Sequence, residues 1–299
     1  MLEIIQKRKY MYVFSGTLLV LSIIFLAKWG LRLGLDFKGG TLMEIAFVKE
    51  PAPVAADIEN ALKDLDLRSL AVQATGKSGV IIRYLASDDT VNGKVLEQLK
   101  GLDPGLTLLR TDFIGASVSS QIKTSAFWGI LFSVLGIAAY IAFAFRGVSR
   151  PIGSWEYGFG AVVALIHDIL ITVGVFSLLG HFDNVEVGVP FVAALLTILG
   201  YSVNDTIVVY DRIRENLLRV KSKTDFEGTV NRSVNETMAR SINTSMTVII
   251  VLVAIVLFGG ASIKWFAVAL LIGVAFGTYS SIFVASALLV SRYKMKFEQ

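Results

Sequence analysis

The chain has 299 residues, of which 54 % are hydrophobic and 17 % charged, with 0 cysteines and 2 histidines. Soluble domains carry about 25 % charged residues, so this composition and a mean hydropathy of +0.66 exclude an ordinary soluble enzyme. The lack of cysteine excludes disulfides, thiolate metal sites and cysteine nucleophiles, and we expect no metal and no cofactor. A net charge of +4 could indicate nucleic-acid binding, but the placement of the lysines and arginines indicates membrane topology instead, so we expect no nucleic-acid partner.

Six nearly uncharged stretches are long enough to cross a bilayer. A membrane-spanning helix needs about 20 mainly apolar residues, and a helix satisfies its own backbone hydrogen bonds in lipid. The six stretches are residues 10–27, 124–145, 157–179, 187–210, 241–263 and 265–291. We therefore predict an α-helical membrane protein with six transmembrane helices, the first within residues 1–28 and the other five within residues 124–299.

Lysine and arginine gather on one side of these predicted spans. They occur at residues 7–9, 146–150, 211–240 and 292–296, whereas the two short loops of the opposite side hold one lysine, Lys264. Because cytoplasmic loops carry the excess of positive charge, we predict that both termini and the loop 211–240 are cytoplasmic. Helical segments predicted within this loop have a basic face that suits anionic lipid, although a solvated charged loop explains it as well.

Residues 29–123 are the one stretch outside the predicted spans that is long enough to fold alone. Their place between the first two spans predicts an external domain. Its hydrophobic patterns follow one another as strand, helix, strand, strand, helix and strand. This order predicts a ferredoxin-like α+β domain.

Ionisable side chains inside predicted spans are costly to bury and are therefore candidates for function. His167 and Asp168 lie at the middle of the third span, and Asp205 lies in the fourth. Helical spacing places Tyr201 and Asn204 on the same face as Asp205. A purely structural role is the alternative for each, and we favour it for His167 and Asp168 because consecutive helical residues point about 100° apart.

Arg240 begins the fifth span, at a depth from which its long side chain could reach Asp205. An ion pair would keep Asp205 charged, and protonation would break the pair and alter helix packing. This arrangement predicts a proton switch. Asn243 and Thr244 follow Arg240 and could either line a polar path or make interhelical hydrogen bonds.

Three segments of the sequence resemble motifs of a known family. The first, residues 34–41, contains Asp36, Phe37, Gly39, Gly40 and Thr41; the others are residues 199–216 and 240–245. They are similar to the SecF family, the smaller membrane subunits of SecDF protein-export complexes within the resistance-nodulation-division superfamily. The likeness covers the whole chain.

The resemblance implies an accessory subunit of the Sec machinery that is driven by the proton motive force and is not an enzyme. It implies pairing with SecD, action at the SecYEG channel on preprotein substrates, and a place in the bacterial cytoplasmic (inner) membrane. It also implies that Asp205 is the proton-carrying carboxylate and Arg240 its basic partner.

Three other functions were weighed against this one. The first is half of a proton-driven exporter of lipids or small molecules from the same superfamily. The second is an intramembrane aspartyl protease using Asp168 and Asp205, which is disfavoured because the G-x-G-D motif is missing. The third is a non-transporting scaffold, against which an intramembrane Asp205 argues.

Overall fold

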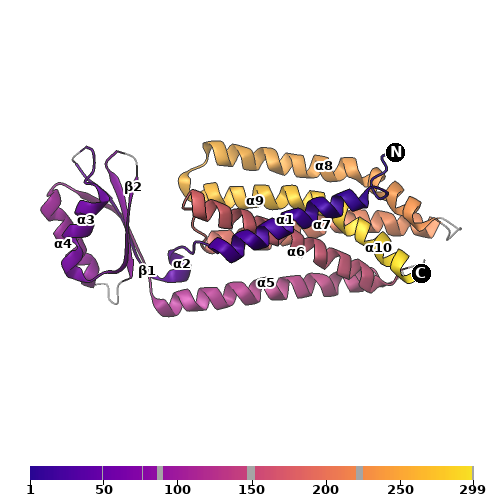
Figure 1. The fold of residues 1–299 in the computed structure, drawn as a ribbon, viewed down its shortest axis with the longest axis horizontal. Coiled ribbons are helices and arrows are strands. Elements are labelled where there is room, and N and C mark those ends of the chain that lie inside the picture. The colour runs from indigo at the N-terminus through magenta and orange to yellow at the C-terminus, as the bar shows by residue number, and fades with distance from the viewer. Residues whose placement is uncertain (49, 76, 86–89, 147–151, 220–224, 298–299) are drawn as a thin grey trace. The chain divides into compact units, whose positions relative to one another are not determined.

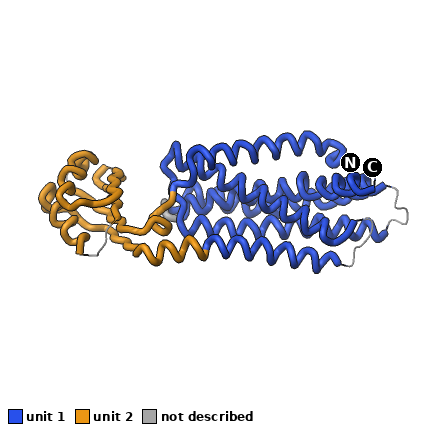
Figure 2. The backbone as a smooth tube through the Cα atoms, turned by 60° about the horizontal axis from the view of Figure 1, so that its bottom comes forward, with its two compact units in different colours: residues 1–32, 126–299 blue, residues 33–125 orange. Residues whose placement is uncertain are grey.

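The computed structural model describes residues 1–48, 50–75, 77–85, 90–146, 152–219 and 225–297. The chain forms two compact units (Figure 2). Unit 1 comprises Met1–Arg32 and Ala126–Gln299, and unit 2 comprises Leu33–Ser125.

Among the described residues, six helices are long and apolar enough to cross a membrane. They are α1 (Arg8–Trp29), α5 (Ala116–Ala144), α6 (Ser154–Phe182), α7 (Val189–Arg219), α8 (Phe226–Phe258) and a last helix in which α9 (Ala261–Ser280), a π-helical segment (Ser281–Ala285) and α10 (Ser286–Phe297) follow without interruption. The predicted multi-pass helical fold is confirmed.

The charged segments at residues 211–219 and 226–240 belong to the long helices. The helical segments predicted within the loop 211–240 are the ends of these two helices, since α7 continues to Arg219 and α8 already begins at Phe226. Neither segment contains a proline, so nothing in them breaks the helical hydrogen bonding. Asp225 caps α8 by accepting a hydrogen bond from the Gly228 amide at 2.7 Å.

The N-terminus and the end of α10 lie at the same end of the helix bundle (Figure 1). The first residues are fastened to α8, because the Asn231 side-chain oxygen accepts a hydrogen bond from the Ile5 amide at 3.2 Å. Glu227 pairs with Arg8 at 2.6 Å and with Lys294 at 2.5 Å, which links α8 to α1 and α10.

The helices of unit 1 differ in how deeply they are buried. About half of the residues in the most apolar 18-residue stretch of α6, of α7 and of the last helix are buried, against 6–17 % in α1, α5 and α8. Small residues bring the inner helices close together; a Cβ on Gly273 of α9 would lie 2.2 Å from the Ile198 side chain of α7. The exposed apolar faces suit contact with lipid.

Unit 2 is an antiparallel sheet with helices on one face (Figure 1). In chain order it contains α2 (Leu35–Lys38), β1 (Gly40–Ala46), α3 (Ala55–Ala61), a 3₁₀ turn (Lys63–Leu65), β2 (Arg68–Thr75), β3 (Gly79–Leu85), α4 (Thr90–Leu102) and β4 (Thr107–Ile114). The strand order is β2-β3-β1-β4, and β1 pairs with β3 from Thr41 opposite Tyr84 to Ala46 opposite Gly79. The predicted ferredoxin-like domain is therefore confirmed. Met43, Ile45 and Ile82 of the sheet pack with α3 and α4 in its core.

The motif around Gly39 and Gly40 forms the start of β1. Both glycines have a positive φ, 74° and 108°, which side chains disfavour. A Cβ on Gly40 would also lie 2.5 Å from the Tyr84 carbonyl oxygen. The neighbouring Phe37 and Thr41 side chains are buried, and Asp36 lies in the first turn of α2. These glycines let two strands approach closely, which is a structural role.

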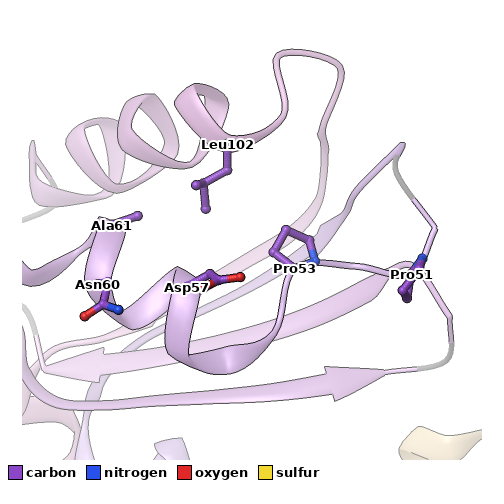
Figure 3. A pocket seen from close by; sticks show the side chains of 6 residues that line it. All are labelled: Pro51, Pro53, Asp57, Asn60, Ala61 and Leu102. Atoms are coloured by element: carbon purple, nitrogen blue, oxygen red, sulfur yellow. The ribbon is translucent and has the colours of Figure 1, made fainter.

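A shallow depression beside α3 is the pocket of unit 2 shown in Figure 3. Its lining residues are Pro51, Pro53, Asp57, Asn60, Ala61 and Leu102. One carboxylate among apolar and amide groups does not provide paired acid and base groups for catalysis. The polar chemistry of the protein is instead concentrated in unit 1.

Candidate functional site

Asp205 lies on the inner side of α7 with only 8 % of its surface exposed. Its Oδ2 accepts a hydrogen bond from the Ser281 hydroxyl, at the start of the π-helical segment. Ser241 of α8 lies close to the same carboxyl group, but its buried hydroxyl has no hydrogen-bond partner within the described part of the chain. Three helices thus meet at this carboxyl group.

Arg240 is near Asp205 but is not bonded to it. Its charge acts on the Asp205 carboxyl group, while its side chain is exposed at the surface of α8. Among the described residues, no ion pair joins the two. The ion pair predicted between Asp205 and Arg240 is therefore not formed in this structure.

Tyr201 joins the site through a chain of hydroxyl groups. Its phenol donates to the Ser245 hydroxyl of α8 at 3.1 Å, and Ser245 is hydrogen-bonded to the Thr278 hydroxyl of α9. Thr278 donates onward to the Val274 carbonyl at 3.0 Å. This chain links α7, α8 and α9 one helical turn from Asp205.

Three residues predicted to support the site point elsewhere. Asn204, Asn243 and Thr244 are exposed on the outer faces of α7 and α8. In this part of α8 the side chains of Ser241 and Ser245 are buried instead. Helical phase explains this, because residues four apart share a face.

His167 and Asp168 face a common interior, although consecutive helical residues were expected to diverge. Both side chains are almost fully buried, and His167 Nδ1 lies 2.9 Å from Asp168 Oδ1. Asp168 Oδ2 accepts hydrogen bonds from Ser202 of α7 at 2.6 Å and from Ser280 of α9 at 2.8 Å. The two side chains therefore turn toward each other, although their Cα–Cβ bonds point in different directions from the helix.

Sequence reasoning missed Ser202, Ser280 and Ser281. Serine is common in transmembrane helices, where it makes hydrogen bonds between helices, so a single serine carries little signal. The run of hydroxyl-bearing residues at 278–281, in an otherwise apolar span, could have indicated them.

Buried carboxyl groups surrounded by hydroxyl donors can hold or release a proton, because a hydroxyl donates to a carboxylate and accepts from a carboxylic acid. Within the described residues, no group of three or more His, Asp or Glu side chains could hold a metal ion.

Comparisons with known proteins show which family this chain resembles. A family model described as Protein export membrane protein SecD/SecF, C-terminal, matches residues 94–295, and a second, the SecD/SecF GG Motif, matches residues 24–50. Protein translocase subunit SecF of Thermobaculum terrenum is 42 % identical, covering 97 % of this chain and 94 % of the relative. The subunit of the same name from Haemophilus influenzae is 36 % identical, covering 96 % of this chain and 84 % of the relative.

The structural comparison agrees with the sequence comparison. The crystal structure of SecDF from Thermus thermophilus, described as a translocon-associated membrane protein, superimposes with a TM-score of 0.81 and 29 % identity. The match covers 96 % of this chain and 38 % of the solved chain. A second SecDF structure, in a super-membrane-facing form, gives a TM-score of 0.68 and 30 % identity.

The chain is a multi-pass membrane protein with a ferredoxin-like domain between its first two spans, and the relatives that it matches are subunits of a protein-transport machinery. The chain belongs to the SecF family of protein translocase subunits. The relatives are named for transport rather than for a catalysed reaction, in agreement with the prediction that the chain is not an enzyme.

Proposed function

We propose that this protein is an accessory subunit of a Sec protein-export machinery in the bacterial inner membrane. It pairs with SecD and uses the proton motive force to promote the translocation of preproteins through a SecYEG channel. The match to the SecDF structure covers 38 % of the solved chain. The remaining length of that chain supports a larger, SecD-like partner for this one.

The observation that carries this proposal is the environment of Asp205. The carboxyl group is buried in α7, bonded to one serine hydroxyl and held near a positive charge that does not pair with it. Moving one charge across a membrane releases about 2.3 kcal/mol per 100 mV, so a carboxyl group that binds and releases protons there can drive a conformational change without ATP.

Arg240 is the basic partner in this mechanism. When Asp205 is ionised, the guanidinium can turn inward and pair with the carboxylate. Protonation removes the attraction, and Arg240 returns to the exposed position seen here. The two positions of Arg240 would shift α8 against α7, and the proton sets which position is occupied.

Both termini and the region 211–240 lie in the cytoplasm in this proposal, and residues 29–123 lie outside. The distribution of lysine and arginine supports this orientation. The basic ends of the helices face the headgroups of anionic lipid, and the ferredoxin-like domain lies on the side where a preprotein emerges.

The proposal is tested by preprotein translocation into inverted membrane vesicles that lack SecD and SecF. Adding back this chain with its SecD partner is expected to stimulate the late stage of translocation only when a proton gradient is imposed, at constant ATP. Equal stimulation without a gradient would contradict proton coupling.

Pairing is tested separately by affinity purification of this chain from detergent-solubilised membranes. A SecD-like chain is expected to copurify in a fixed ratio. Purification of the chain without such a partner, from membranes that contain one, would contradict the pairing.

A further inference from the structure

A second buried carboxyl group lies in unit 1, apart from the one that the proposed function uses. Asp168 is 0 % exposed. Its two oxygens are bonded to three side chains, His167, Ser202 and Ser280, at 2.9, 2.6 and 2.8 Å. Such a set of partners accommodates both the ionised and the protonated carboxyl group, since hydroxyl hydrogens rotate to suit either.

The groups that face Asp168 from the surrounding helices leave it without a permanent counter-charge. Helix by helix, they are His167 on α6, Ser202 on α7 and Ser280 on α9. Tyr279 of α9 stacks beside the His167 ring and is hydrogen-bonded to Ser15 of α1. In the described part of the chain, no lysine or arginine forms an ion pair with Asp168. Because an isolated buried charge is very costly, uptake of a proton by the pair of His167 and Asp168 would remove the charge of an ionised Asp168.

His167 has a second ring nitrogen that the cluster does not use. Nε2 is buried and makes no hydrogen bond to any described residue, while the ring stacks beside Tyr279 with the centroids 6.1 Å apart. Buried polar atoms are nearly always hydrogen-bonded, so an unpartnered one calls for an explanation. Nε2 is the position at which the pair of His167 and Asp168 can receive a proton.

Two consecutive serines connect this carboxyl group to Asp205. Ser280 donates to Asp168 and Ser281 donates to Asp205. Consecutive helical residues point about 100° apart, so one short segment reaches two different carboxyl groups. The helix changes from α to π at Ser281, and π-helical turns occur frequently at functional sites.

We propose that Asp168 and His167 form a second proton-binding site, and that Ser280 and Ser281 couple its occupancy to that of Asp205. A proton that binds His167 Nε2 gives an imidazolium ion, whose Nδ1 proton then passes to Asp168 Oδ1. The ring is left neutral and the carboxylic acid is formed. This inference deepens the proposed function and rests on Asp205 being its proton carrier.

The test is an infrared pH titration of the purified full-length chain, following the carbonyl stretching band of protonated carboxyl groups. We expect two buried components in the unmodified chain. Asp168→Asn should remove one and Asp205→Asn the other, and each replacement should shift the titration midpoint of the component that remains. A folded Asp168→Asn chain with an undiminished band would overturn the proposal.

If Asp168→Asn does not fold, serine variants test the coupling between the two carboxyl groups. Chains with Ser280→Ala and Ser281→Ala retain both carboxyl groups, and their components should titrate with midpoints shifted from those of the unmodified chain. Ser291→Ala on α10, which removes a hydroxyl bonded to Tyr12 of α1, is the matched control and should change neither midpoint. Unchanged midpoints in the Ser280→Ala and Ser281→Ala chains would overturn the coupling.

Failure of this proposal differs from failure of the proposed function. If Asp205→Asn leaves gradient-driven translocation intact, the proposed function fails, whatever the infrared spectra show. If the spectra contain the Asp205 component alone while translocation depends on Asp205, only the second site is overturned.

Discussion

At the scale of single residues, burial distinguishes the carboxyl group proposed to carry protons from another carboxyl group on the same helix. Asp205 and Asp211 are carboxylates on the same helix, but the first is buried at 8 % exposure and the second has a side chain that is 67 % exposed. The protein interior surrounds the carboxyl group of Asp205, whereas that of Asp211 lies mostly in the open. Asp211→Asn is therefore a matched control for Asp205→Asn.

Arg240 should act through its charge. Because its guanidinium is exposed and unbonded to Asp205 in this state, Arg240→Lys retains the charge and loses only the planar fork. We expect Arg240→Lys to lower gradient-driven translocation moderately and Arg240→Ala to abolish it. Arg232→Ala, which removes an exposed arginine from the same helix, should have little effect, and an Arg240→Ala chain with full activity would exclude Arg240 as a partner.

At the scale of elements, unit 2 contains an apolar core of its own, in which α3 and α4 pack on β1, β2 and β3, while β4 pairs with β1. Residues 33–115 should therefore fold in isolation. In this fragment, Gly40→Ala should lower the free energy of unfolding by about 1–3 kcal/mol, because an alanine there combines a disfavoured φ with a contact too close to Tyr84. Thermal melting followed by circular dichroism measures the change.

The control for Gly40→Ala is Gly93→Ala in the same fragment. Gly93 lies exposed on α4 and a Cβ there meets nothing within 4 Å. Alanine should stabilise the helix by about 0.5–1 kcal/mol. A fragment that melts without cooperativity would contradict the independence of unit 2.

The contact between α1 and α6 depends on a glycine. A Cβ on Gly174 of α6 would lie 2.6 Å from the backbone Cα of Ser22 on α1. Gly174→Ala should therefore force the helices apart and cost about 1–3 kcal/mol, seen as a lower melting temperature of the full-length chain in detergent. Gly136→Ala on α5, where nothing lies within 4 Å, should leave it unchanged or higher, and equal effects would contradict this packing.

At the scale of the whole molecule, much of the fold could be predicted from periodicity and hydropathy. The transmembrane helices could be predicted because a lipid bilayer requires long apolar helices. The order of strands and helices in unit 2 could be predicted because the spacing of hydrophobic residues differs between strands and helices. The ends of α7 and α8 were not, because their polar turns carry no breaking residue and simply continue the helices. Local pattern cannot separate a polar turn of a long helix from a short surface helix.

The site could be predicted only in part. Asp205 stood out because a carboxylate in an apolar span is rare. The contact between His167 and Asp168 depends on side-chain torsions, and the roles of Ser280 and Ser281 depend on which helices pack together. The spacing of residues along the sequence determines neither the side-chain torsions nor the helix packing, so these contacts could be found only in the structure.

The central claim is that one carboxyl group, Asp205, couples the proton gradient to export. Its most direct test compares Asp205→Asn with Asp211→Asn in the vesicle translocation assay, with and without an imposed proton gradient. Asparagine keeps the size of the side chain and removes its titration. The account predicts that Asp205→Asn loses all gradient-dependent stimulation while Asp211→Asn retains it; full stimulation in Asp205→Asn vesicles would contradict the account.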